Sequence, residues 1–138
     1  MDSRRAVKMK WKGSGFRFRG GGTHPETPEI DVDGSGEEGP SPMLALLLAA
    51  GGCSGADVVM ILEKMRVELS DVEIEVEGVR AETEPKRYVT LRFHFKIAGK
   101  GLDEEKAKRA VDLSMEKYCS VVHSLAPDIE IAYGFELA

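Results

Sequence analysis

The residues of this sequence that are best suited to chemistry are its two cysteines, Cys53 and Cys119. If the fold brings them together, one thiolate can attack the O–O bond of a peroxide and become a sulfenic acid, which the second thiol then converts into a disulfide. Cysteine is also a small apolar residue that is often simply buried, and the spacing of the two alone leaves both interpretations open.

Histidine and arginine side chains offer two further possibilities. His123 lies one helical turn after Cys119, and together with Cys53 these side chains would make a three-ligand zinc site. No recognised metal motif accompanies them, so we expect no metal and an ordinary surface or interface histidine. Arg17 and Arg19 share one face of a predicted strand. They either lower the pKa of a nearby thiol and polarise a peroxide, or form a solvated strand face.

Composition and charge limit the class of protein. The chain has 138 residues and a formal net charge of -5, which fits one domain and argues against a nucleic-acid partner. Its N-terminus is polar and basic, so we predict no secretory signal, and no stretch looks long enough to span a membrane. We therefore expect a cytoplasmic protein, in which cysteines are more often catalytic or metal-binding than structural.

Cys53 must be positioned by a helix, which the sequence predicts over residues 42–66. This helix begins with a Ser-Pro start signal, and residues 42–53 carry no charged side chain. We expect this half to be buried on all sides, with a second subunit helping to cover it. The glycine pair at 51–52 predicts an interruption, after which residues 54–57 would cap a second segment. Cys53 would then lie near a helix N-terminus, where the amide dipoles favour a thiolate.

Strands are predicted on both sides of this helix. Residues 5–33 alternate as a hairpin followed by a third strand, and residues 71–98 alternate as two longer strands. The outward positions of those two strands are acidic in the first and basic in the second. Opposite charges facing each other across an antiparallel pair contribute roughly 0.2–1 kcal/mol each, so we expect these strands to pair.

The remaining elements complete a single α+β domain over residues 1–138. A helix over residues 103–125 begins with acidic side chains, and from Cys119 it either continues or restarts as a short second helix. A final strand alternates over residues 128–137. The order of elements predicts an antiparallel sheet packed on helices.

Two stretches of the chain resemble motifs of a known family. Residues 42–66, with their apolar run, GGC and ADVVMILEKMR, look like the first cysteine motif of the OsmC/Ohr family. This is the osmotically inducible protein C and organic hydroperoxide resistance family. Residues 109–121, RAVDLSMEKYCSV, resemble its second motif, with Cys119 at the second cysteine position. The chain is more similar to the less-characterised OsmC-like branch than to Ohr proper.

The resemblance implies a fold and an activity. The fold would be an OsmC-like intertwined homodimer, with long central helices and two equivalent active sites at the interface. The activity would be that of a peroxidase acting on organic hydroperoxides or hydrogen peroxide in oxidative-stress defence. Cys53 would attack and Cys119 would resolve, with no bound cofactor and with an external dithiol as the reductant.

The resemblance also implies residues that this chain lacks or places differently. Family members use an N-terminal arginine, which would be Arg17 or Arg19 here, and a glutamate just after the helix-start proline. Met43 follows that proline in this chain, so the glutamate is missing. The alternative function, from another class, is a non-enzymatic dimeric module that binds an apolar small molecule or senses redox state.

Overall fold

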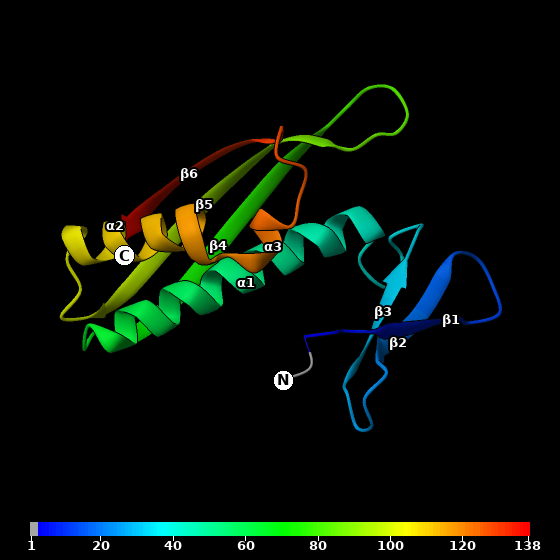
Figure 1. The fold of residues 1–138 in the computed structure, drawn as a ribbon, viewed down its shortest axis with the longest axis horizontal. Helices are drawn as coiled ribbons and strands as arrows, with labels where there is room; N and C mark the ends of the chain where they lie inside the picture. The colour runs from blue at the N-terminus through cyan, green and yellow to red at the C-terminus, as the bar shows by residue number, and fades with distance from the viewer. Residues whose placement is uncertain (1–2) are drawn as a thin grey trace. The chain divides into compact units, whose positions relative to one another are not determined.

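The computed structural model describes residues 3–138. The chain forms an N-terminal unit that ends at Leu46 and a C-terminal unit, Leu47–Ala138. Figure 1 shows the order of helices and strands along the chain, and the two units are described separately below.

The N-terminal unit is built on a three-stranded antiparallel sheet. Its strands β1 (Val7–Trp11), β2 (Arg17–Gly22) and β3 (Glu29–Asp33) lie in the order β1-β2-β3, which confirms the predicted hairpin and third strand. The pleat sorts the side chains by face, because partners across the strands point to the same side. One such row is apolar and consists of Trp11, Phe18 and Val32, and the next is polar and consists of Lys10, Arg19 and Asp31.

The central helix α1 (Pro42–Lys64) is continuous, so the predicted interruption at the glycine pair is wrong. The glycines serve packing instead. A Cβ atom on Gly51 would lie 3.2 Å from Val76, and one on Gly55 would lie 2.6 Å from Ile74. A glycine in a helix costs about 1 kcal/mol relative to alanine, and here close contact with strand β4 offsets that cost. Cys53 therefore lies in the middle of a helix and not near an N-terminus.

Helix α1 is also less buried within one chain than we predicted. Only about a third of its most apolar stretch is buried, on the face that carries Ala50, Ser54, Gly55, Val58 and Leu62. Because the helix is unbroken, its length and composition are also sufficient to cross a membrane, contrary to the expectation from the sequence. A core helix passes the same test, so this property alone decides nothing about location.

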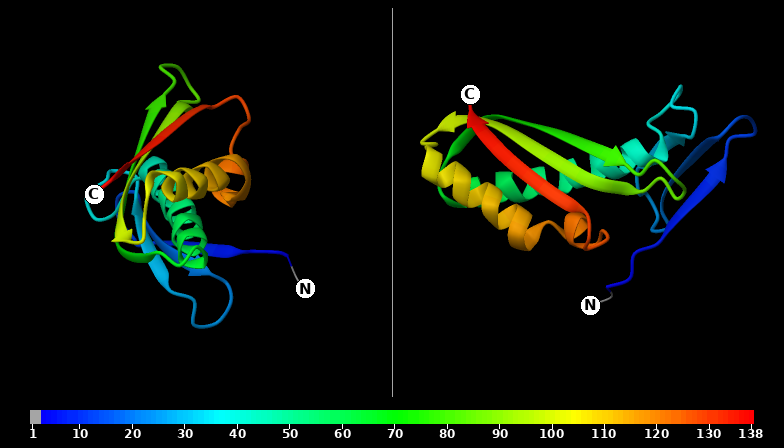
Figure 2. Two further views of the ribbon diagram at one scale, coloured as in Figure 1. Left: turned by 90° about the vertical axis from the view of Figure 1, so that its left-hand side faces the viewer. Right: turned by 90° about the horizontal axis from the view of Figure 1, so that it is seen from above.

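Strands β4 (Glu68–Arg80) and β5 (Tyr88–Lys100) pair in antiparallel fashion, as predicted. The expected charge complementarity is present, since the acidic residues of β4 face basic residues of β5 in three pairs: Glu73 with Lys96, Glu75 with His94, and Glu77 with Arg92. The other face of β5 is fully buried and supplies the aromatic part of the core. Helix α2 and most of α1 cover this face of the sheet, as the views in Figure 2 show.

The last strand, β6 (Glu130–Leu137), pairs with β5 in parallel, so the predicted all-antiparallel sheet is wrong and the sheet is mixed. The reason lies in the connection between them. Helix α2 (Glu104–Leu113), a π-helical turn η1 (Ser114–Tyr118) and the short helix α3 (Ser120–His123) carry the chain back along the sheet. A strand that follows such a crossover runs in the same direction as the strand that preceded it.

Candidate active site

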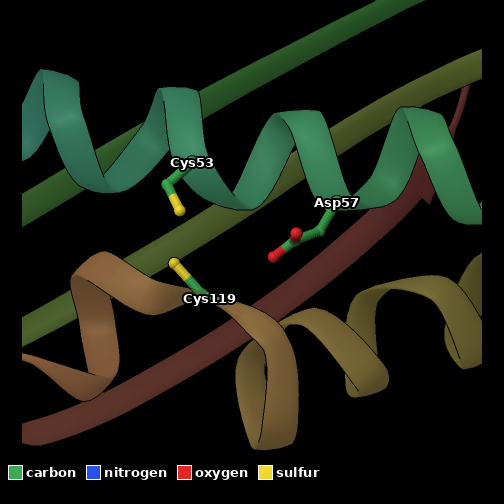
Figure 3. A group of neighbouring side chains, drawn as sticks. All are labelled: Cys53, Asp57 and Cys119. Atoms are coloured by element: carbon green, nitrogen blue, oxygen red, sulfur yellow. The ribbon is translucent and has the colours of Figure 1, made fainter. Parts of the chain in front are cut away.

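The C-terminal unit brings the two cysteines together beside an aspartate. The sulfur atoms of Cys53 and Cys119 and a carboxylate oxygen of Asp57 all lie within 4.8 Å of one another. Cys53 and Asp57 are four residues apart on α1, so their side chains project from the same face of the helix. Figure 3 shows both side chains pointing toward Cys119, which reaches the site from the chain segment opposite.

Cys119 is positioned by an irregular end to the second helical segment. Its backbone N–H donates to the carbonyl of Ser114 over 2.8 Å, which closes the π-helical turn η1. The Cys119 backbone is then extended, with φ -68 and ψ 101, before α3 begins. Single π-turns are frequent at functional sites, and here the turn ends the segment immediately before Cys119. Of the two continuations considered for this segment, the short second helix is therefore confirmed.

Burial controls the protonation of Cys119. The residue is fully buried, and this desolvation raises the pKa of its thiol to about 11. The neighbouring Cys53 thiol and the Asp57 carboxylate act in the same direction, and the backbone amide of Val122 opposes them. Cys119 is therefore a protonated thiol at neutral pH.

Asp57 is a site residue that sequence reasoning missed, because residues 54–57 were interpreted as a helix cap. In the structure, the hydroxyl of the fully buried Ser114 donates to Oδ2 of Asp57 over 3.0 Å. The signal that could have found Asp57 is its spacing of four residues from Cys53, which places both on one face only if the helix is unbroken.

His123 does not complete the metal site considered from the sequence. Its Nδ1 atom lies 2.9 Å from the carbonyl oxygen of Cys119, and its Nε2 atom lies 3.2 Å from that of Glu116. Both ring nitrogens thus face backbone carbonyls. The third potential ligand beside the two thiols is Asp57 instead.

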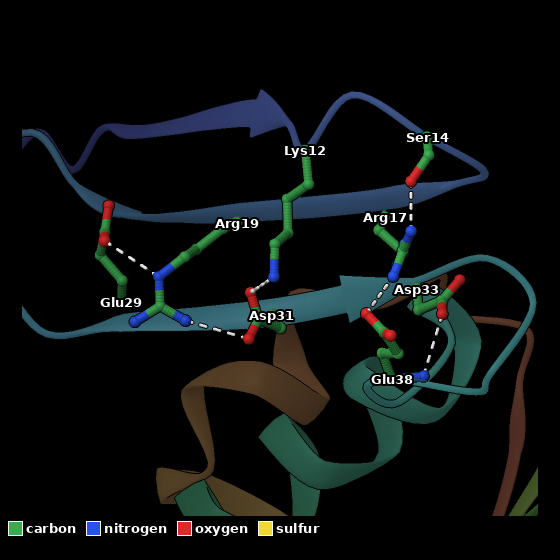
Figure 4. Close-up of polar contacts among 8 residues, drawn as sticks. All are labelled: Lys12, Ser14, Arg17, Arg19, Glu29, Asp31, Asp33 and Glu38. Atoms are coloured by element: carbon green, nitrogen blue, oxygen red, sulfur yellow. Dashed lines mark hydrogen bonds and ion pairs between the residues drawn. The ribbon is translucent and has the colours of Figure 1, made fainter.

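The two candidate arginines belong to the polar face of the N-terminal sheet, where Figure 4 shows their partners. Arg17 pairs with Glu38 and also donates to Ser14. Arg19 lies 3.2 Å from Glu29 and 3.0 Å from Asp31. These partners raise the pKa of both guanidinium groups, which are therefore permanent cations. Glu38 provides a carboxylate for Arg17, although the glutamate expected after the helix-start proline is absent.

The mixed sheet, the long central helix and the facing thiols define a small α+β protein with a paired-cysteine site. The family model described as OsmC-like protein matches residues 34–133. This match includes both cysteines and most of the chain, and the protein belongs to the OsmC family. The predicted family resemblance is confirmed.

Relatives and solved structures agree with this assignment. The chain is 40% identical over 132 residues to Protein YhfA of Escherichia coli strain K12, covering 95% of this chain and 96% of YhfA. It is 31% identical to a hypothetical protein from Aquifex aeolicus VF5, whose crystal structure matches with a TM-score of 0.83 over 99% of each chain. The organic hydroperoxide resistance protein OhrB of Bacillus subtilis shares the fold at 16% identity, with a TM-score of 0.62 over 96% of this chain and 98% of that one.

Proposed function

We propose that this protein is a thiol-dependent peroxidase that reduces organic hydroperoxides or hydrogen peroxide through Cys53 and Cys119. The observation that carries the proposal is the distance between the two sulfurs, which lie within 4.8 Å although the residues are far apart in sequence. A disulfide needs the sulfurs at about 2.05 Å, so the two side chains must still move together when the bond forms. Solved structures with the same fold are named as organic hydroperoxide resistance proteins, which supports this class of substrate.

The exposure of the two thiols supports the roles that we propose for them. Cys53 is half-buried, whereas Cys119 is fully buried, which favours Cys53 as the thiol that meets the peroxide. The Cys53 thiolate attacks the terminal oxygen of the hydroperoxide and the O–O bond breaks, so that Cys53 becomes a sulfenic acid and the leaving alkoxide takes a proton from water to give the alcohol. The Cys119 sulfur then attacks the Cys53 sulfur, and its thiol proton leaves with the sulfenic hydroxyl as water. An external dithiol reduces the resulting disulfide.

We propose that a cation favours the attacking thiolate, because the charged group of the cluster, Asp57, is a carboxylate. Arg17 and Arg19 are the candidates, and we favour Arg17. Arg19 is held by two carboxylates of its own sheet, whereas Arg17 is paired with a single carboxylate, Glu38. The Arg17–Glu38 pair takes the place of the arginine–glutamate pair implied by the family.

We also propose that the active protein is a homodimer. The side of α1 that is exposed in one chain is apolar at every fourth residue: Leu44, Leu48, Gly52, Ala56 and Met60. Leu48 alone is 64% exposed. The apolar face of the N-terminal sheet is exposed as well, including Trp11 and Phe18. Exposed apolar surfaces of this kind are typical of interfaces, and a second copy of the chain is the occupant that we propose. We also propose a cytoplasmic location, where reducing conditions would supply the external dithiol that reduces the disulfide.

Peroxide consumption with dithiothreitol as the reductant tests the peroxidase directly. Cumene hydroperoxide and hydrogen peroxide serve as substrates for the wild type, Cys53→Ser, Cys119→Ser and the control Tyr133→Phe. We expect background rates for Cys53→Ser, a rate that declines within a few turnovers for Cys119→Ser, and wild-type rates for the control. Equal background rates in wild type and Cys53→Ser would contradict the proposal and favour the alternative, a dimeric binding module.

A further inference from the structure

We call Cys53, Cys119 and Asp57 the thiol cluster. It contains a negative charge, that of Asp57, which the peroxidase chemistry does not explain. Asp57 is half-buried, and its hydrogen-bond donor is the neutral hydroxyl of Ser114. Within residues 47–138, none of the ion pairs in the structure joins Asp57 to a lysine or arginine. A partly buried carboxylate is costly unless a cation compensates its charge. The cluster therefore has the composition of a site for a cation.

Its donor atoms suit a particular class of cation. Two sulfurs and one carboxylate oxygen are ligands for zinc and for softer divalent ions such as cadmium, but not for magnesium or calcium. Zinc bonds of about 2.3 Å to sulfur and about 2.0–2.2 Å to oxygen place tetrahedral ligands roughly 3.5–3.8 Å apart. The three donor atoms already lie within 4.8 Å of one another, so we expect rotation of the side chains to bring them to the spacing of zinc ligands.

The surroundings of Asp57 support a ligand role. The Oγ atom of Ser114 lies 3.0 Å from Oδ2 of Asp57 and 3.4 Å from the carbonyl oxygen of Ser54, and both serines are fully buried. Metal-ligating carboxylates are usually oriented by an outer hydrogen bond of this kind. Two of the three ligands also come from one face of α1, which packs closely on β4 through Gly55.

We propose that reduced Cys53, Cys119 and Asp57 bind one Zn²⁺ ion per chain, with a fourth position open to water or a substrate atom. Binding replaces the two thiol protons, which are released to solvent. A hydroperoxide reverses the binding: the two thiolates and the peroxide, with two protons, give the disulfide, free Zn²⁺, the alcohol and water. The metal would protect the resting thiols, and peroxide would release it.

Titration of the full-length reduced protein with Zn²⁺, in competition with a chromophoric chelator, tests this site without reference to peroxidase activity. Cd²⁺ provides a second readout through the ultraviolet absorption of thiolate–cadmium bonds. The variants are Cys53→Ser, Cys119→Ser, Asp57→Asn and Ser114→Ala. The controls are His123→Ala, which removes the ligand considered from the sequence, and Asp112→Asn, which changes a carboxylate of α2 outside the cluster.

We expect one equivalent per chain for the wild type and both controls, and no stoichiometric binding for either cysteine variant. Ser114→Ala should weaken binding by about 10- to 100-fold, as for other outer hydrogen-bond partners, and Asp57→Asn by at least as much. Unmutated protein oxidised to the disulfide should not bind, which gives a test independent of variant folding. Wild-type affinity in Asp57→Asn, or no binding by the reduced wild type, would overturn the proposal.

Discussion

The polar face of the N-terminal sheet and the thiol cluster differ in how their charged side chains are paired. On the sheet, Arg17, Arg19 and Lys12 each have a carboxylate partner, and every one of these groups is at least partly exposed. In the cluster, the single carboxylate of Asp57 faces two thiols and a serine hydroxyl. Each of these three cations of the sheet therefore has a carboxylate partner, whereas no ion pair within residues 47–138 joins Asp57 to a cation.

The difference indicates that the arginines and Lys12 of the sheet already have carboxylate partners, whereas the Asp57 carboxylate is held by a neutral hydroxyl. Exposed ion pairs contribute little to folding, so the pairs of the sheet can be rearranged at small cost. A partly buried acid such as Asp57 is costly without a cation, so we expect it to be retained where something compensates its charge. A guanidinium from the sheet or a metal ion would each balance the cluster, and the experiments below separate these possibilities.

Disrupting the proposed dimer should have the largest effect. Leu48→Asp places a carboxylate on the apolar stripe of α1, and burying that charge at an interface costs several kcal/mol. We expect the dimer to weaken by roughly 1000-fold in Kd, with peroxidase activity falling in parallel. Sedimentation across a concentration series measures the association. Val79→Asp, at another exposed apolar position, should leave it unchanged, and a wild-type chain that remains monomeric would exclude the dimer.

Removing the proposed activating cation should have the next largest effect. We expect Arg17→Gln to lower the rate of peroxide reduction by about 100-fold, a typical cost of losing one preorganised charged donor. Arg19→Gln is the matched control and should stay near the wild-type rate. Thermal unfolding should change little in both, since the pairs are exposed. Wild-type rates in both variants would show that neither guanidinium serves the thiolate.

Two glycines of α1 test whether packing on β4 holds the cluster in place. Gly55→Ala would bring a Cβ atom to 2.6 Å from Ile74, and overpacking of this kind costs about 1–3 kcal/mol of unfolding free energy. Within one chain a Cβ atom on Gly52 meets nothing within 4 Å, so in the Leu48→Asp background, which disrupts the proposed dimer, Gly52→Ala should stabilise the helix by up to about 1 kcal/mol. Urea unfolding of the two variants measures the contrast. Equal effects would mean that the helix does not rely on close contact at Gly55.

The smallest effect concerns the loop that carries Glu38. The Ser35 hydroxyl, the backbone amide of Glu38 and that of Ser35 donate to Asp33 and lower its pKa from 3.8 to about 2. Because the folded pKa is depressed, this stabilisation is complete above about pH 4 and is lost as the pH falls toward 2. Fluorescence of Trp11, the single tryptophan, should report the change. Asp33→Asn should flatten this acid dependence, whereas a Glu37→Gln control should retain it.

Much of the fold could be predicted because its signals are local. Alternation located the strands, and the charges on β4 and β5 predicted their pairing. The break at the Gly51–Gly52 pair was wrong because a helix propensity argument does not include the side chains of β4 that fill the space above Gly51 and Gly55. The parallel placement of β6 was missed for a similar reason, since strand direction depends on where the preceding helices cross the sheet.

The residues of the candidate site also differ in whether a local sequence signal could predict them. The meeting of Cys53 and Cys119 was expected from motifs that both lie in the sequence, and the structure places the two sulfurs within 4.8 Å of each other. Asp57 could not be recognised while the helix was expected to restart beside it. The partners of Arg17 and Arg19 were also beyond reach, because they depend on the register of β2 with β3 and on a loop with no repeating pattern.

Peptide mapping of the oxidised protein tests the central claim most directly. Reduced protein, freed of metal with a chelator, is treated with one equivalent of cumene hydroperoxide and digested without reductant. We predict a peptide that links Cys53 to Cys119, from protein that migrates as a single chain in a denaturing gel without reductant. Cys53 oxidised to sulfinic acid, with Cys119 still a free thiol, would contradict the two-cysteine cycle.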